Sequence, residues 1–487
     1  MYQFKENIMK SKIILSSLGA AVLASASCTQ QKNDQPNIIY ILADDLGYGD
    51  LGCYGQEIIQ TPHIDALAAN GMMFTQHYSG STVSAPSRSS LMTGLHTGHT
   101  FIRGNKEHIP EGQYPIPGDT YTIGKMLQEA GYVTGAFGKW GLGYPGSEGD
   151  PNNQGFNEFF GYNCQRLAHH YFPDHLYHNQ EKVILEGNQG LKKEQYAPDI
   201  IQEKTLEFIR ANADNKFFLF VPHVIPHAEL VAPDDSIYAM YKGQIEEVKI
   251  YKGVDEGENY KNGPYGSSEY PRTDFAAMVA RLDMHVGQIV EELKRLGIAD
   301  NTLIIFTSDN GPHREGGADP DFFKSYGPLR GFKRDLFEGG IRVPMIASWP
   351  AKIKAGSVSD HISAFWDMMP TFQELSGSKA KITTDGISMV PTLLSKNDQK
   401  AHPHLYWEFH EQGGRIAVRK GNWKGVKLNF KKNPKAQMLL FDLSTDLREE
   451  NNIAEQHPEI VAELEKIMKD SHVPSEVFNF GSPTIIQ

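Results

Sequence analysis

The segment Asn37–Ala43 reads NIIYILA and is followed at once by Asp44 and Asp45. An uninterrupted apolar run rich in β-branched residues is typical of a parallel strand that is covered on both faces. Runs of the same kind occur at 132–138, 216–221 and 302–308. Polar residues follow these runs, and ligands in open α/β sheets bind beyond the carboxyl ends of the strands. The pattern therefore predicts an α/β fold with a site at one edge of a mostly parallel sheet.

The chain divides into two parts with different patterns. Segments with helical spacing accompany the buried runs at 122–130, 275–296 and 367–375. Beyond the small, polar segment 376–385, short strand-like runs occur at 405–409, 415–419, 423–428 and 438–442, and a helical segment at 457–470. The chain of 487 residues is also longer than one core usually supports. We therefore predict a main domain at 36–375 and a smaller one at 376–487, with an antiparallel sheet and a helix.

Charge and cysteine content exclude some functions. The formal net charge is −12, whereas a protein that binds a nucleic acid duplex needs a basic face, so no nucleic acid partner is expected. Any anionic substrate must be held by local cations. Cys53 and Cys164 lie far apart in the sequence and lack metal-type spacing, which favours two free, buried thiols over a disulfide.

Residues 1–28 have the pattern of an export signal. Lys10 and Lys12 precede an apolar run at 13–24 that is too short to span a bilayer, and small residues then lead to Cys28. A cysteine in this position resembles the bacterial lipoprotein box. It implies lipidation of Cys28, a tether at 29–35, and a lipid anchor as the only membrane attachment, in the periplasm or at the outer-membrane surface. The alternative is a simple secreted protein in which Cys28 is incidental.

Two pairs of polar residues follow buried strands. Asp44 and Asp45 come after the first strand, and Asp309 and Asn310 come after the run at 302–308. Adjacent carboxylates are costly to bury without a cation, and hard oxygen ligands are those that Ca²⁺ or Mg²⁺ select. Without a metal, the same residues would be ordinary solvated turns.

The segment 84–94, SAPSRSSLMTG, opens a predicted helix. Proline is tolerated in a first turn and residues four apart share a face, so Ser84 and the charge of Arg88 lie side by side. This suits an anionic substrate, although the short pattern alone is also that of a polar helix cap. With its longer spacing, the segment resembles the signature of the type I sulfatases, in the alkaline phosphatase superfamily. Residues 46–55, LGYGDLGCYG, resemble the N-terminal motif of the same family.

This resemblance implies both a fold and a site. The fold would be alkaline-phosphatase-like, a mostly parallel sheet sandwiched by helices, with a smaller C-terminal sheet. The first residue of the signature is oxidised to formylglycine by a maturing enzyme, which makes Ser84 the precursor of the nucleophile, with Arg88 beside it. Together with residue 84, one Ca²⁺ would be held by Asp44, Asp45, Asp309 and Asn310.

Other motifs of the family supply cations and an acid. Lys139 in GKWGLG and Lys333 in LRGFK match the lysines that bind sulfate and neutralise its oxygens in the transition state. His227, in a Pro-His pair, matches the histidine that faces the ester and protonates the leaving oxygen. The commoner pattern has a histidine two residues after the first lysine, where this chain has Gly141. His169 is a candidate replacement.

The expected substrate is a sulfated carbohydrate. The loop from His169 to His178 is rich in aromatic residues and histidines, and aromatic faces pack on sugar rings. We expect Arg103, His170 and His410 to help select the sugar. A galactose or N-acetylgalactosamine sulfate is the expectation at the level of the family.

Two other functions are alternatives. A phosphatase or phosphodiesterase of the same superfamily would use Ser84 directly with two transition metals, but it needs more Asp and His ligands, and Asn310 supplies an amide instead. A non-catalytic lipoprotein that binds sulfated glycans would keep its serine unoxidised. The presence of both lysines and His227 argues against this second alternative.

Overall fold

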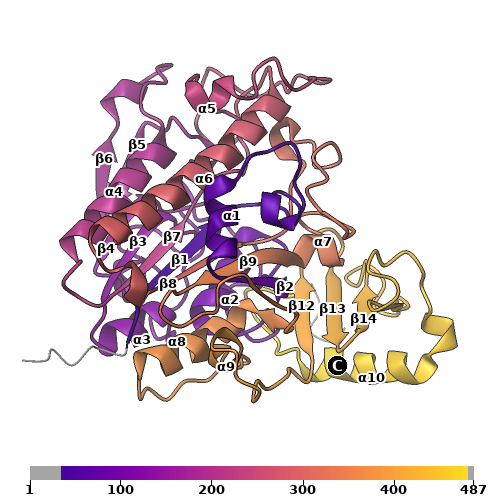
Figure 1. Cartoon of the computed structure of the whole chain (residues 1–487). Coiled ribbons are helices and arrows are strands. Elements are labelled where there is room, and N and C mark those ends of the chain that lie inside the picture. Colours follow the sequence, from indigo (N-terminus) through magenta and orange to yellow (C-terminus); the bar gives the residue numbers. More distant parts are fainter. Residues whose placement is uncertain (1–34, 481–487) are drawn as a thin grey trace, which may run out of the picture. The chain divides into compact units, whose positions relative to one another are not determined.

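The structure, a computed structural model, describes residues 35–480 (Figure 1). The predictions for the export signal, for Cys28 and for the tether up to residue 34 lie outside the described residues. Within 35–480, no helix has the length and apolar character needed to cross a membrane. Cys53 and Cys164 are both free, as predicted, but Cys53 is only half-buried.

A sheet of eleven strands forms the centre of the fold. Its strand β1 (Asn37–Ala43) pairs in parallel with β7 (Phe217–Pro222) and with β8 (Thr302–Ser308), and β7 pairs in parallel with β3 (Val133–Lys139). These are the apolar runs of the sequence, and the predicted bounds agree to within one residue. Every residue of β1, β7 and β8 is buried, as expected for parallel strands covered on both faces.

The other strands extend the sheet on both sides. The order is β10-β2-β9-β8-β1-β7-β3-β4-β5-β6, with β11 beside β2. The pairs β2–β9, β8–β9, β4–β5 and β5–β6 are antiparallel, so the sheet is mixed at its margins. The bounds of these strands are β2 (Met72–Tyr78), β4 (Glu158–Tyr162), β5 (His175–His178), β6 (Glu181–Ile184), β9 (Arg342–Ser348), β10 (Ser357–Ser359) and β11 (Ser363–Ala364).

Helices cover both faces of this sheet. On one face, α6 (Pro271–Arg295) contacts α1 (Pro62–Ala69) and α4 (Ala197–Ala211); α6 lies above the central strands β1, β7 and β8 in Figure 1. On the other face, α2 (Ser84–Thr93), α3 (Ile123–Glu129) and α8 (Met368–Ser376) contact one another, and α3 and α8 lie below the sheet. Short helices are α5 (Ser236–Ala239), α7 (Glu338–Ile341) and α9 (Val390–Leu393).

A second, antiparallel sheet follows in the order β12 (Leu405–Phe409), β13 (Arg415–Lys420), β14 (Trp423–Lys427) and β15 (Leu439–Asp442). Helix α10 (Pro458–Asp470) packs on it through Leu464 and Met468. Trp407 belongs to a different core, which it shares with Tyr78 and Trp366, and its indole donates a hydrogen bond to the carbonyl of Ser79 at 2.9 Å. The predicted C-terminal sheet and helix are confirmed. The domain boundary at 375 stays a prediction.

Candidate active site

The carboxyl ends of β1, β3, β7 and β8 lie next to one another in the sheet. Asp44 and Asp45 follow β1, Lys139 is the last residue of β3, and Asp309 follows β8. All four side chains are fully buried. The sheet therefore gathers charged groups from distant parts of the sequence at one edge, as the sequence predicts.

Helix α2 brings Ser84 and Arg88 to this edge. Val83 is the cap residue and Ser84 is the first residue of the helix, so Ser84 and Arg88 are one turn apart on the same face. The Ser84 hydroxyl donates a hydrogen bond to Asp44 Oδ1 at 3.1 Å. Arg88 Nη2 lies 2.9 Å from Asp309 Oδ2 and 3.5 Å from Asp44 Oδ2, so one guanidinium joins the ends of two strands.

The two predicted sulfate-binding lysines join the same network. Lys139 Nζ lies 2.6 Å from Asp44 Oδ2, and Lys333 Nζ lies 2.8 Å from Asp45 Oδ2. Burial lowers the pKa of Lys139, and Asp44 offsets only part of this effect. Burial would also lower the pKa of Lys333, but Asp45 and Glu315 outweigh it and raise that pKa. Lys333 therefore stays charged in the interior.

The oxygen ligands fit a hard divalent cation. Asn310 Nδ2 donates to Asp45 Oδ1 at 2.6 Å, whereas Asn310 Oδ1 is buried and has no hydrogen-bond partner among the described residues. Burial and the neighbouring Asp44 raise the pKa of Asp309 to about 6, because the charged form lacks solvation. Three carboxylates and an unpaired amide oxygen form the donor set that Ca²⁺ or Mg²⁺ prefers. A cation there would give Asn310 Oδ1 a partner and would stabilise the charged form of Asp309.

Three histidine rings stack together, and the middle one, His227, contacts Lys333. His227 donates a hydrogen bond from Nδ1 to the carbonyl of Ala228, and its Nε2 lies 3.0 Å from Lys333 Nζ. Its ring stacks on His169, with centroids 5.4 Å apart, and on His313 at 5.7 Å. Burial lowers the pKa of His227, and it lowers the pKa of His169 to about 3. Both rings are therefore neutral near pH 7, with Nε2 of His227 as an acceptor.

The predicted sugar-selecting residues lie in other contacts. His410 Nε2 and Arg103 Nη1 both contact the buried carboxylate of Glu408, at 2.8 and 3.0 Å. His170 is buried, and its Nδ1 lies 3.3 Å from Glu229. The structure thus joins Arg103 to His410 but does not bring these residues into contact with Ser84. Their role toward a sugar stays a prediction.

Gln165 is a site residue that the sequence reasoning missed. A Cβ at Gly141 would lie 2.5 Å from Gln165 Nε2 and 3.9 Å from Arg88 Cδ, so the amide fills the space that a side chain at 141 would need. Gln165 is 7% exposed, and its Nε2 has no hydrogen-bond partner among the described residues. The signal that could have found Gln165 was the glycine at position 141, where the commoner family pattern has a histidine. A missing side chain leaves space that another side chain can fill.

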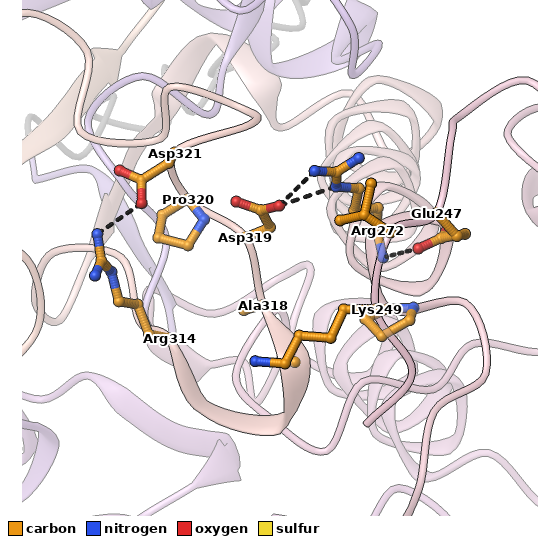
Figure 2. Close-up of a pocket in the computed structure, with 11 residues that line it drawn as sticks. Glu247, Lys249, Arg272, Arg314, Ala318, Asp319, Pro320 and Asp321 are labelled. Atoms are coloured by element: carbon orange, nitrogen blue, oxygen red, sulfur yellow. Dashed lines mark hydrogen bonds and ion pairs between the residues drawn. The ribbon is translucent and has the colours of Figure 1, made fainter. Parts of the chain in front are cut away.

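A cavity of about 260 Å³ is lined by Arg314, which precedes Glu315 in the chain, and Glu315 lies 3.5 Å from Lys333. Figure 2 shows Arg314 directed at Asp321 and Arg272 directed at Asp319 across this cavity. These charges are already paired with one another. The catalytic candidates do not line it.

Comparison with known proteins identifies the family. The family described as Sulfatase matches residues 36–378. The chain belongs to the sulfatase family. A second family, described as N-sulphoglucosamine sulphohydrolase, C-terminal, matches residues 331–473 of this sulfatase. The α/β fold with its C-terminal antiparallel sheet is thus confirmed as the sulfatase fold, and the enzyme hydrolyses sulfate esters.

Relatives match nearly the whole chain. The N-acetylgalactosamine-6-O-sulfatase of Bacteroides thetaiotaomicron is 30% identical over 496 residues, which cover 90% of this chain and 93% of that protein. Arylsulfatase A of Homo sapiens is 31% identical, over 80% of this chain and 74% of its own. The crystal structure of Ps i-CgsB in complex with k-i-k-neocarrahexaose has a TM-score of 0.75 at 30% identity, covering 92% of this chain and 96% of that one. Membership of the family implies a metal and a formylglycine.

Proposed function

We propose that this sulfatase removes sulfate from a galactose or N-acetylgalactosamine unit of a glycan, with a formylglycine derived from Ser84 and one Ca²⁺. The observation that carries this proposal is the contact of Ser84 with the buried cluster that includes Asp44 and Lys139. The similarity to an N-acetylgalactosamine-6-O-sulfatase over 90% of the chain supports the choice of sugar.

The protein's own residues bind the sulfate and handle the proton. Lys139 and Lys333 supply positive charge in a buried setting, where solvent screens it little, to the oxygens on which charge develops. Arg88 holds Asp44 and Asp309 in place. His227 keeps its Nδ1 proton on a carbonyl, so Nε2 is the atom at which the ring takes up a proton from solvent and passes it to the departing sugar oxygen, while Lys333 keeps its charge.

Residues of the site are already placed to hold the cation. Asp44, Asp45, Asp309 and Asn310 would hold Ca²⁺ together with residue 84. When present, formylglycine supplies the nucleophilic hydroxyl, and the cation favours its ionised form.

The test compares protein from a host that has a serine-type maturing enzyme with protein from a host that lacks one. We expect mass spectrometry to show that the peptide containing residue 84 has lost two hydrogens in protein from the first host only. Only that protein should hydrolyse a sulfate ester. Ser84→Ala made in the first host is the control and should be inactive but folded. Full activity with an intact serine would contradict the proposed nucleophile.

We also propose that the enzyme is exported and anchored through a lipid on Cys28. The pattern of residues 1–28 supports this proposal. The measurement is the membrane fraction of the native host, from which Cys28→Ala should be lost.

A further inference from the structure

A second cavity, of about 390 Å³, adjoins the histidines of the active site. His169 lines it, and the His169 ring stacks on His227 with a 13° angle between the ring planes. The cavity therefore opens beside the residue that faces the departing oxygen in the proposed reaction.

Three loops build this cavity. Glu107 belongs to the segment after α2, in which Asn105 accepts a hydrogen bond from the backbone N–H of Ala85 at 3.0 Å, next to Ser84. Arg166 and His169 come from the loop after β4, and the segment 259–264 comes from the loop before α6. His169 Nδ1 donates to the carbonyl of Gly263 at 2.6 Å, which ties two of the loops together.

The lining suits hydroxyl groups. Arg166 pairs with Glu107 at 2.5 Å and donates to the carbonyl of Asn262 at 3.2 Å. The side chains of Arg166 and Glu107 are 35% and 38% exposed, so both can reach a ligand. With the amides of Asn259 and Asn262, the cavity offers donors and acceptors without a net excess of one charge. This balance favours a neutral polyhydroxylated ring over a second anion.

We infer that this cavity is the subsite for the sugar ring that carries the sulfate, and that Arg166 determines the preference for saccharides over small aryl sulfates. The inference rests on the proposed function and deepens it. A bound sugar would exchange the Arg166–Glu107 contact for bonds to its hydroxyls. The cavity in Figure 2 also contains paired arginines, but no histidine lines it.

The two cavities provide a matched control. Arg166 and Arg314 each pair with one carboxylate, at 2.5 and 2.7 Å, and both are partly exposed. Exposed ion pairs contribute little to stability, so Arg166→Ala and Arg314→Ala should both fold. Each variant, matured and loaded with Ca²⁺, is assayed on 4-nitrophenyl sulfate and on sulfated disaccharides of galactose and N-acetylgalactosamine, and binding of the desulfated disaccharides is measured by their inhibition of aryl sulfate hydrolysis.

We expect Arg166→Ala to lower kcat/KM on the preferred disaccharide at least tenfold, mainly through KM, to weaken inhibition by the desulfated sugar, and to change aryl sulfate hydrolysis less than twofold. Arg314→Ala should change neither. Equal losses on both substrates, or a larger effect of Arg314→Ala, would overturn the subsite while leaving the proposed function intact. If the unaltered enzyme hydrolyses the aryl sulfate but none of the disaccharides, the proposed substrate and the subsite are both wrong.

Discussion

At the scale of single residues, Gln165 shows how the glycine at position 141 changes the site. Its amide occupies the space beside Gly141, and the donor Nε2 is buried without a partner. An unpaired buried donor costs free energy, so such groups usually have a hydrogen-bond partner, which can be a ligand or a water molecule. We predict that Gln165 donates a hydrogen bond to the bound sulfate.

Replacing Gln165 tests this role. Gln165→Ala should lower kcat/KM for an aryl sulfate by about tenfold, or about 1.4 kcal/mol of transition-state stabilisation. Gln165→Glu has the same size but faces the sulfate with a carboxylate, so its loss should be larger. Steady-state kinetics and inhibition by inorganic sulfate measure both effects. Wild-type kinetics in Gln165→Glu would refute the role.

At the scale of elements, a buried ion pair joins the second sheet to helix α7. Lys424 of β14 lies 2.8 Å from Glu338 of α7, and both side chains are fully buried. Breaking such a pair leaves an uncompensated charge, so Glu338→Gln should lower the free energy of unfolding by about 3–5 kcal/mol. Urea unfolding at pH 7 measures this change. The exposed pair Lys466–Asp470 provides the control, because Asp470→Asn should cost less than about 1 kcal/mol.

The same pair predicts a dependence on pH. Burial would raise the pKa of Glu338, but Lys424 and neighbouring arginines hold it at about 2 in the folded protein. In the unfolded chain a glutamate has a pKa of about 4.3, so this stabilisation is complete above that pH and is lost as the pH falls toward 2. The unfolding free energy should therefore fall more steeply below pH 5 in the unaltered protein than in Glu338→Gln. Parallel curves would contradict the assignment.

At the scale of the whole molecule, the proposed metal joins strands from distant parts of the chain. Asp45 and Asn310 are 265 positions apart, yet they are hydrogen-bonded. A cation that binds only the folded protein stabilises it, by about 2.7 kcal/mol at a hundred times its Kd. We predict that Ca²⁺ raises Tm even when Ser84 is unmodified, and that Asn310→Ala reduces the rise. Asn70→Ala, at an exposed helix end, should not. Stoichiometric zinc in the purified protein would instead favour the phosphatase alternative.

The sequence by itself determined the central strands and the edge at which the site lies. Continuous apolar runs such as Asn37–Ala43 are typical of parallel strands covered on both faces, and the polar residues that follow several such strands meet at the carboxyl edge of the sheet. Ser84 and Arg88 share a helix face because of their spacing alone. These conclusions depend on local periodicity, which a sequence displays directly.

Only the tertiary structure decided which partner each buried polar group has. Arg103 and His410 meet at Glu408, and Gln165 fills the space at Gly141, although nothing in their local spacing indicates either contact. The physical reason is that a buried charge or amide bonds to whatever group the packing of distant segments places within about 3 Å of it. The partner therefore depends on how strands and loops far apart in the chain pack together, and the local sequence pattern does not indicate it.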